Sequence, residues 1–292
     1  MQAAEFDRST LDVLWGKAKD FWIRYRRNRV AILGLLIVGL ISFVAIFAAF
    51  LAPYEPWRIG FETIRPPSKA HLFGTDDLGR DIYTRTLFGA RMSLMVGILA
   101  ALTSSVIGIA VGAIAGFMGG KIDDVLMRIT ELFQVMPKFF LALMIAFFFG
   151  PSVWNIIFVI GILSWPSTCR LVRAEFLSLK EQEFVLAARS IGARKSSIIF
   201  NEILPNASPP VIVNASLQVA SAILIEATLS FFGLGDPSWV SWGRMLYDAQ
   251  RLLRVAWWVS FFPGASIFLV VLGLNLVGDG MNDALNPRLR ET

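Results

Sequence analysis

The chain has 292 residues, of which 55% are hydrophobic and 17% are charged, with 27 Lys and Arg against 22 Asp and Glu. A soluble domain is about 25% charged, so this composition excludes an ordinary globular enzyme and indicates a membrane protein. The excess of positive charge is spread between apolar runs rather than gathered in one domain, which argues against nucleic acid as a partner.

The first predicted element is a transmembrane helix over residues 30–52. Residues 30–51 carry no charge, and about 20 apolar residues suffice to cross a bilayer. The run is too long for a signal-peptide core, so we expect it to be retained. Residues 1–29 form a predicted cytoplasmic segment with amphipathic helical spacing over 11–25. That pattern fits either a helix in the membrane interface or a helix packed on the protein.

Residues 53–90 form a predicted external loop, followed by a core domain over 91–279 and a tail over 280–292. Four further uncharged runs mark the core, at residues 92–120, 139–169, 203–225 and 255–278. The second of these is divided at Gly150 and Pro151, because proline removes a backbone donor and glycine favours a break. The two pieces are helices over 124–149 and from about 153 to 172. The predicted fold is therefore an all-α membrane protein with six transmembrane helices.

Orientation follows from the basic residues that flank the predicted helices. Residues 1–29 and the segment from Arg170 to Lys195 are rich in Lys and Arg, whereas the loop over 53–90 is charge-balanced. Because Lys and Arg favour the cytoplasmic side, both basic segments are expected there. With six crossings, the N- and C-termini are both predicted to be cytoplasmic.

Residues 178–205 form a long polar segment on the predicted cytoplasmic side. The spacing predicts two short helices parallel to the membrane, with an elbow at Gly192 and an end at Pro205. Ala187 and Ala188 would allow close approach of a partner, and charged neighbours could pair with it. The segment is either a solvated connector or a knob that fits a groove on a soluble subunit.

Two further groups of residues are candidates for function or packing. Gly97, Gly108, Gly112 and Gly116 form a small-residue surface on the second crossing, which serves either helix packing within the chain or a subunit interface. Four tryptophans near the last crossing are interpreted as an interfacial belt, with a stacking platform for sugar or peptide as the alternative. They are Trp239, Trp242, Trp257 and Trp258.

Glu226 is the one acidic residue at the end of a long apolar run. A membrane acid is a functional candidate because an unpaired charge there is costly. It could bind a substrate amine, or pair with Ser221, Ser230 or another subunit. We favour the structural interpretation, because Glu226 is predicted near the outer end of its helix.

The segment over residues 178–205 resembles the coupling loop of permease subunits in ATP-binding-cassette importers. Ala187-Ala188, Gly192 and Leu204-Pro205 match that family's pattern in spacing. Leu186 stands where the general pattern has Glu, and Glu202 stands where an apolar residue is usual. Glu183-Phe184-Val185 is nevertheless similar to the dipeptide/oligopeptide/nickel branch.

A second match lies in the predicted external loop, where residues 71–81 resemble a signature of the C-type permease of that branch. The motif residues are Gly74, Thr75, Asp76, Leu78, Gly79, Arg80 and Asp81. Two glycines and two carboxylates predict a tight turn, and Arg80 could pair with Asp81 or a neighbour. We favour a folded loop that caps the helices over direct contact with substrate.

The resemblance covers roughly residues 20–290 and implies a type I importer permease in the plasma (inner) membrane. It implies four kinds of partner: a homologous second permease, two cytosolic ATP-binding subunits, an external solute-binding protein and the lipid bilayer. Oligopeptides are the first substrate class it suggests, with oligosaccharides or nickel as alternatives. It also implies a set of residues that couple to the ATP-binding subunits: Glu183, Ala187, Ala188, Arg189, Gly192, Leu204 and Pro205.

The chain itself is expected to be non-catalytic. It has one cysteine and one histidine, Cys169 and His71, which excludes an intrachain disulfide and a zinc site made of several Cys and His, and no cofactor is expected. No P-loop occurs, so ATP would be hydrolysed by another subunit. The rival function is an ion-coupled secondary transporter, which would need buried titratable groups or broken helices in two related halves. A membrane assembly factor is a third possibility, but it leaves the coupling segment unexplained.

Overall fold

The structure, a computed structural model, describes residue 16 and residues 19–135 and 137–285. These residues are nearly all helical, and extended pairing among them is limited to one antiparallel bridge between Thr75 and Asp81. The predicted all-α class is confirmed. Residues 19–25 are helical, whereas most of residues 11–18 and the tail from residue 286 lie outside the described residues.

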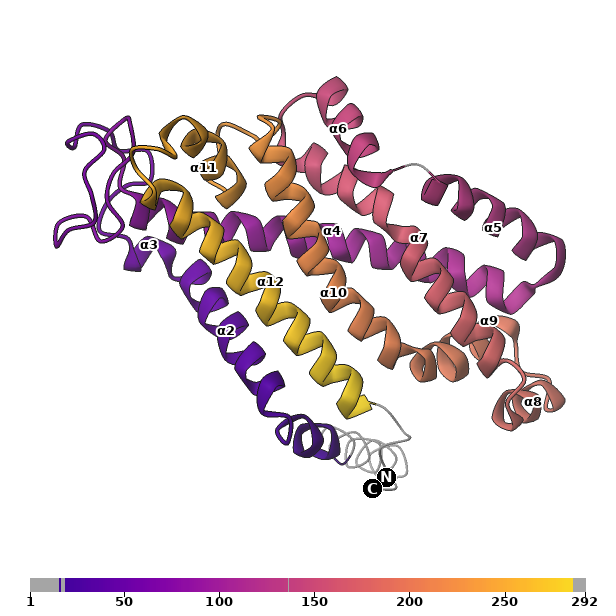
Figure 1. Cartoon of the computed structure of the whole chain (residues 1–292). Coiled ribbons are helices and arrows are strands. Elements are labelled where there is room, and N and C mark those ends of the chain that lie inside the picture. The colour runs from indigo at the N-terminus through magenta and orange to yellow at the C-terminus, as the bar shows by residue number, and fades with distance from the viewer. Residues whose placement is uncertain (1–15, 17–18, 136, 286–292) are drawn as a thin grey trace, which may run out of the picture.

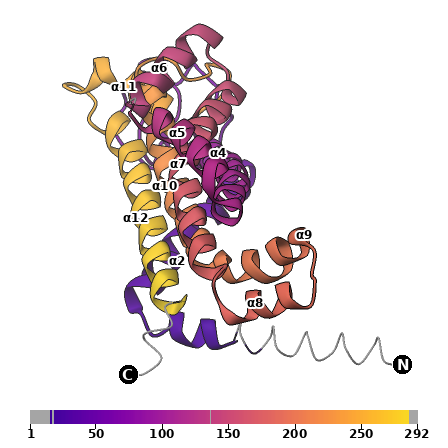
Figure 2. The same cartoon turned by 90° about the vertical axis from the view of Figure 1, so that its right-hand side faces the viewer.

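The helices form an elongated bundle with two distinct ends (Figure 1). One end, here called the loop end, carries residues 53–81 and the short helix α11 (Trp242–Ala249). The opposite end, here called the coupling end, carries the short helix α8 (Glu183–Ser190) together with the start of α2 (Arg29–Ile46). Figure 2 shows α8 and α9 (Lys195–Ser197) standing out sideways from the coupling end.

Within the described residues, five helices are long and apolar enough to cross a membrane. They are α2, α4 (Ile82–Met118), α7 (Val153–Leu179), the continuous stretch Lys195–Phe231 that includes α10 (Leu204–Phe231), and α12 (Trp258–Leu285). The remaining predicted crossing, the third along the chain, is a bent pair, α5 (Gly120–Val135) and α6 (Lys138–Phe149), whose axes differ by 82°. The break lies at Pro137, which occupies the N-cap position of α6 and has no N–H to continue a helix from α5, so the crossing predicted as one helix over 124–149 is two helices.

The first crossing is also interrupted. Asn28 caps α2 by accepting hydrogen bonds from the backbone N–H groups of Val30 and Ala31. The helix ends at Phe47, after which α3 (Ala48–Leu51) adds one further turn. The first crossing thus ends close to the position expected from its apolar run.

Helix α4 begins earlier than the apolar pattern suggested. The Asp81 carboxylate accepts a hydrogen bond from Thr84 N at 2.7 Å and caps the helix. Residues 82–90, which the sequence pattern places in the external loop, are therefore the first turns of α4. At about 1.5 Å per residue α4 is some 55 Å long, so it extends beyond a hydrocarbon core of about 30 Å.

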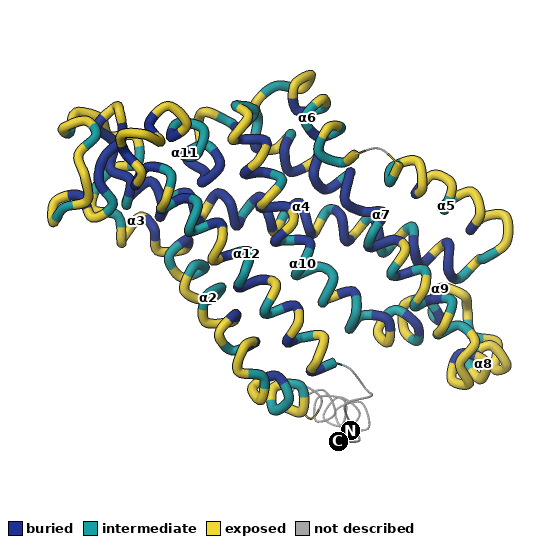
Figure 3. The backbone as a smooth tube through the Cα atoms, viewed as in Figure 1, coloured by how far each residue is buried: buried dark blue, intermediate teal, exposed yellow. Residues whose placement is uncertain are grey.

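The buried residues concentrate along α4 and α7, which lie against each other through most of the bundle (Figure 3). Three glycines of α4 make this contact possible. A Cβ atom on Gly108 would lie 2.6 Å from Thr168 Cβ, and one on Gly112 would lie 2.5 Å from the carbonyl oxygen of Cys169. The predicted small-residue surface is thus a packing surface between helices of this chain. The alternative that it forms a subunit interface is wrong.

The last helix is longer than predicted. Helix α12 contains Pro263 and continues to Leu285, so residues 280–285 of the predicted tail are helical. Asp283 accepts a hydrogen bond from the side chain of Asn28, which ties this end to the start of α2. Tyr25 is buried there with Ala31 and Ala284. At this residue the N-terminal helix therefore packs on the rest of the protein, which was one of its two predicted placements.

Candidate functional site

The coupling segment consists of an exposed helix on a buried apolar base. In α8 the side chains of Glu183, Ala187 and Arg189 are exposed, and Ala188 is half-buried. Val185 is fully buried against Ile198, Ile203, Phe176 and Val172. Helix α8 is therefore fixed to the ends of the long helices at the coupling end while it presents one face to the outside of the chain.

Gly192 forms the predicted elbow between α8 and α9. Its φ angle of +77° lies in the left-handed region that favours glycine, and no atom lies within 4 Å of an added Cβ. A larger residue at this position would thus have to adopt an unfavourable backbone conformation, but its side chain would not clash with any described atom of this chain. Arg189 lies with its guanidinium carbon 5.8 Å from the centre of the Phe117 ring, which holds the elbow near the end of α4.

Pro205 does not end the helix, contrary to the sequence prediction. Helix continues from Lys195 to Phe231, with Leu204 and Pro205 as the first two residues of α10. A π-helical turn, η1 (Ile198–Ile203), precedes the proline. Such a turn widens the helix by shifting its hydrogen bonds, so a residue without an N–H fits without a break. The coupling segment is thus directly continuous with a membrane-spanning helix.

The external-loop motif folds as the predicted tight turn. Gly74 and Gly79 have φ angles of +78° and +68°. Asp76 Oδ1 accepts hydrogen bonds from Leu78 N at 3.0 Å and Arg80 N at 2.8 Å. Gly74 has no room for a side chain, because an added Cβ would lie 2.5 Å from the carbonyl oxygen of Arg65.

Two buried carboxylates tie the motif to the helices below it. Asp81 binds His71 Nδ1 at 2.8 Å as well as capping α4. Asp76 Oδ2 accepts from Arg80 Nε at 2.6 Å and from Arg85 Nη1 at 3.0 Å. Both arginines also reach Asp248 of α11, at 3.0 Å and 3.2 Å. The partners of Arg80 are thus Asp76 and Asp248, and Asp81 is not one of them.

Two of the four predicted belt tryptophans are buried instead. Trp242 donates its indole N–H to Thr86 O at 3.0 Å, and Trp258 donates to Thr75 O at 3.1 Å. They pack α11 and α12 against the motif and the start of α4, so neither the belt nor the stacking platform applies to them. Trp239 and Trp257 are exposed, as both interpretations require.

Glu226 is buried, with 1% of its surface exposed. Its Oε1 atom accepts a hydrogen bond from Ser230 at 2.7 Å, and its Oε2 atom has no partner. An added Cβ on Gly243 would lie 2.6 Å from Ala227 Cα, so α11 closes over this part of α10. The geometry supports the structural interpretation over contact with a substrate.

The residues singled out from the sequence lie in two separate places. The external-loop motif is at the loop end, and the coupling residues are at the coupling end (Figure 1). Near the coupling end the guanidinium of Arg173 binds both oxygens of Asp123, at 2.5 Å and 2.6 Å, a pair that the sequence analysis missed. No group of three His, Cys, Asp or Glu in the described ranges is placed to hold a metal ion.

Two family models match the chain. Residues 108–291 match the binding-protein-dependent transport system inner membrane component, and residues 16–67 match the N-terminal transmembrane domain of oligopeptide transport permease C. The fold is similar to that of a chain in inward-facing structures of the MetNI methionine ABC transporter, with a TM-score of 0.56 at 19% identity. That match covers 67% of this chain and 93% of the other.

Curated relatives are similar over almost their full length. The oligopeptide transport system permease protein OppC of Bacillus subtilis is 41% identical, with 95% of this chain and 91% of the relative covered. The dipeptide transport system permease protein DppC of Alkalihalophilus pseudofirmus is 42% identical, with 93% and 90% covered. The chain belongs to the family of binding-protein-dependent transport system inner membrane components, as a non-catalytic permease subunit of the oligopeptide and dipeptide branch of ATP-binding-cassette importers.

Proposed function

We propose that this permease carries peptides across the plasma membrane and that α8 is the surface that seats on an ATP-binding subunit. A permease of this family works with ATP-binding subunits and a substrate-binding protein. The observation that carries the proposal is the exposed face of α8, which is fixed on a buried apolar base and joined through the elbow at Gly192 to the helix Lys195–Phe231. A load on α8 would pass directly to a membrane-spanning helix.

The substrate class rests on the relatives, whose names specify oligopeptide and dipeptide transport. Oligosaccharides and nickel remain the alternatives. The ligand retained by the solute-binding protein that copurifies with the transporter decides among them. Peptide in that protein supports the proposal, and a sugar or a nickel ion in its place contradicts it.

The proposed assembly contains this chain, a homologous second permease, two ATP-binding subunits and the external binding protein. The two permeases would enclose the translocation pathway, each supplying one half. Within the described residues the elbow at Gly192 is open on its outer side, since nothing lies within 4 Å of its Cβ position. That open space is where the proposed ATP-binding subunit would fit.

Variants of the coupling segment test the proposal. Gly192→Val should reduce copurification of the ATP-binding subunits at least fivefold, because a left-handed backbone costs a non-glycine residue about 1–2 kcal/mol before any clash with the partner. Glu183→Lys should reduce copurification about thirtyfold or more, since losing a docked charge contact costs roughly 2–5 kcal/mol. Peptide uptake by the reconstituted transporter should fall in parallel.

Two loop-end variants serve as controls for these measurements. Gly60 also has a positive φ, +102°, and open space at its Cβ position, so Gly60→Val imposes a comparable backbone strain far from α8. Glu55→Lys reverses an exposed charge at the same end. Neither should change copurification. Normal copurification and uptake with both coupling variants would show that the segment is only a solvated connector.

Orientation is proposed from the basic flanks, with both termini and α8 in the cytoplasm. Single cysteines at two exposed positions, Lys195→Cys and Asp77→Cys, test it in a Cys169→Ala background. A membrane-impermeant maleimide should label only position 77 in right-side-out vesicles and only position 195 in inside-out vesicles. Labelling of both positions from one side would contradict the proposed topology.

A further inference from the structure

Arg91 is an exposed cation in the third turn of α4. It contrasts with Arg80 and Arg85 at the same end, each of which binds both Asp76 and Asp248. In the described part of the chain no carboxylate forms an ion pair with Arg91, and no hydrogen bond engages its side chain. Its guanidinium is therefore available to an anion from outside the chain.

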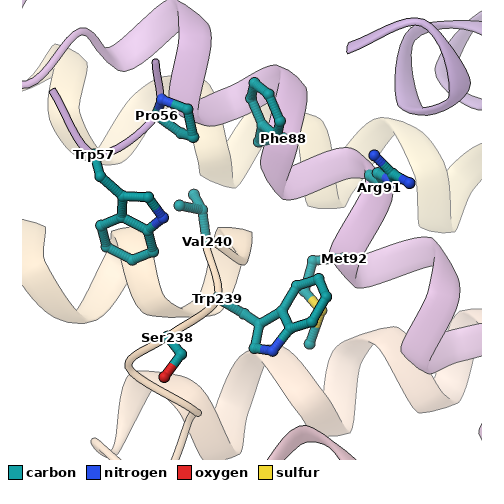
Figure 4. A pocket seen from close by; sticks show the side chains of 8 residues that line it. All are labelled: Pro56, Trp57, Phe88, Arg91, Met92, Ser238, Trp239 and Val240. Carbon is teal, nitrogen blue, oxygen red and sulfur yellow. The ribbon is translucent and has the colours of Figure 1, made fainter. Parts of the chain in front are cut away.

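Two cavities meet at Arg91. The first has a volume of about 320 Å³ and lies between the loop after α3, the start of α4 and the loop before α11 (Figure 4). Trp57, Trp239, Ser238 and Phe88 line it together with Arg91. An indole N–H and a hydroxyl are donors that suit an anionic or hydroxylated group beside the guanidinium.

The second cavity, of about 460 Å³, is an apolar groove between α2 and α4. Besides Arg91, its lining residues are Ser42, Ala45, Ile46, Leu94, Met95 and Ile98. Leu94 and Ile98 lie one and two turns beyond Arg91 along α4, roughly 5 and 10 Å further from the loop end. The groove thus leads away from the cation and into the apolar part of the bundle.

The depth of these residues matches that of a membrane interface. Arg91 directly precedes the uncharged run over residues 92–120, and Ile46 lies five residues before the end of the uncharged run over 30–51. A long basic side chain at such a boundary keeps its charge at the headgroup level, and exposed tryptophans favour the same level. The groove below Arg91 then lies within the hydrocarbon region.

We propose that Arg91 and the groove between α2 and α4 bind an anionic phospholipid. The lipid phosphate would accept hydrogen bonds from Arg91, the headgroup would lie in the cavity beside Trp57 and Trp239, and one acyl chain would fill the groove. A guanidinium donates two parallel, charge-assisted hydrogen bonds to a phosphate, so a phosphate group suits the geometry of Arg91. A peptide carboxylate would use the cation but would leave the membrane-depth groove without an occupant.

Photolabelling of the intact chain tests this site. The probe is phosphatidylglycerol with a diazirine in one acyl chain, reconstituted in vesicles otherwise made of phosphatidylcholine. Peptide mass spectrometry should find labelling concentrated in residues 42–46 and 94–98. The same diazirine on phosphatidylcholine should label these residues about tenfold less, which corresponds to about 1.4 kcal/mol. Equal labelling by the two lipids would overturn the proposal.

Variants separate the headgroup from the acyl chain. Arg91→Gln should lower labelling about tenfold while Arg91→Lys retains most of it, and Ser42→Phe should lower it by filling the groove. Arg254→Gln, which removes another exposed cation at the loop end, should have no effect. Labelling unchanged by Ser42→Phe, or lost equally in Arg254→Gln, would show that the groove is not a specific lipid site.

Two competitors distinguish other occupants. An excess of glycerol 3-phosphate or of a dipeptide should not displace the probe, because neither fills the groove. Displacement by either one would assign the site to a soluble anion and overturn the lipid proposal. The labelling should also persist in the assembled transporter, and its loss there would overturn the proposal, because the second permease would then cover the groove.

Discussion

Replacing Gly112 by leucine should strongly destabilise this permease. An added Cβ atom would lie 2.5 Å from the carbonyl oxygen of Cys169 and 2.9 Å from Val172 Cβ. Because the first obstacle is the backbone of α7, a rotamer change cannot relieve the clash. The helices must separate along a contact that is buried on both sides, at a cost of about 3 kcal/mol or more.

The measurement is thermal unfolding of the purified chain in detergent, followed by loss of the monodisperse peak in size exclusion. A destabilisation of about 3 kcal/mol corresponds to a drop in Tm of about 6–12 °C in a domain of this size. Gly39→Leu is the control, since no atom lies within 4 Å of the Cβ position of Gly39 on α2. An unchanged Tm in Gly112→Leu would mean that α4 and α7 are not in the contact described here.

Arg85→Met should be the second severe variant. Arg85 is 1% exposed, and it binds Asp76 at 3.0 Å and Asp248 at 3.2 Å. Removing it leaves two carboxylates, one of them almost fully buried, to share Arg80 and the more exposed Arg244. Breaking a buried ion pair by deleting one partner costs about 3–5 kcal/mol.

The same unfolding measurement checks this variant, with Arg128→Met as its control. Arg128 pairs with Glu131 at 3.7 Å on an exposed helix face, where such pairs contribute little. A double-mutant cycle between Arg85→Met and Asp248→Asn should show coupling of more than about 1 kcal/mol, because both groups belong to one network. Strictly additive effects would contradict that network.

The apolar runs and their breaks were sufficient to predict the membrane fold. An uncharged apolar stretch of 20 residues or more is long enough to cross a bilayer as a helix and too apolar to remain exposed to water. The existence of α2, α4, α7 and α12 could therefore be predicted directly. Their boundaries did not follow, because they depend on single capping contacts. Asp81 starts α4 ten residues before its uncharged run begins. The third crossing is divided at Pro137, because proline has no backbone N–H to donate to a helical hydrogen bond.

The local geometry of the two motifs was also predictable, but their long-range partners were not. The positive φ angles of Gly74, Gly79 and Gly192 agree with the expected turns. Asp248, by contrast, lies 163 residues after Arg85, and nothing in the local pattern joins them. The local sequence around Asp248 shows only its i,i+4 spacing to Arg244, which is typical of an ordinary ion pair on one helix and does not indicate a contact with Arg85.

The continuity of the helix Lys195–Phe231 gives the coupling end a mechanical link to the loop end. The 28 residues of α10 extend over about 42 Å, so a small tilt at its start near Leu204 becomes a displacement near Phe231 through leverage alone. The points able to absorb torque before it reaches the far end are the π turn and the three prolines at 205, 209 and 210, where backbone hydrogen bonds are missing or shifted. If an ATP-binding subunit seats on α8 as proposed, the stiffness of those few turns sets how much of a movement of α8 reaches the Phe231 end of the helix.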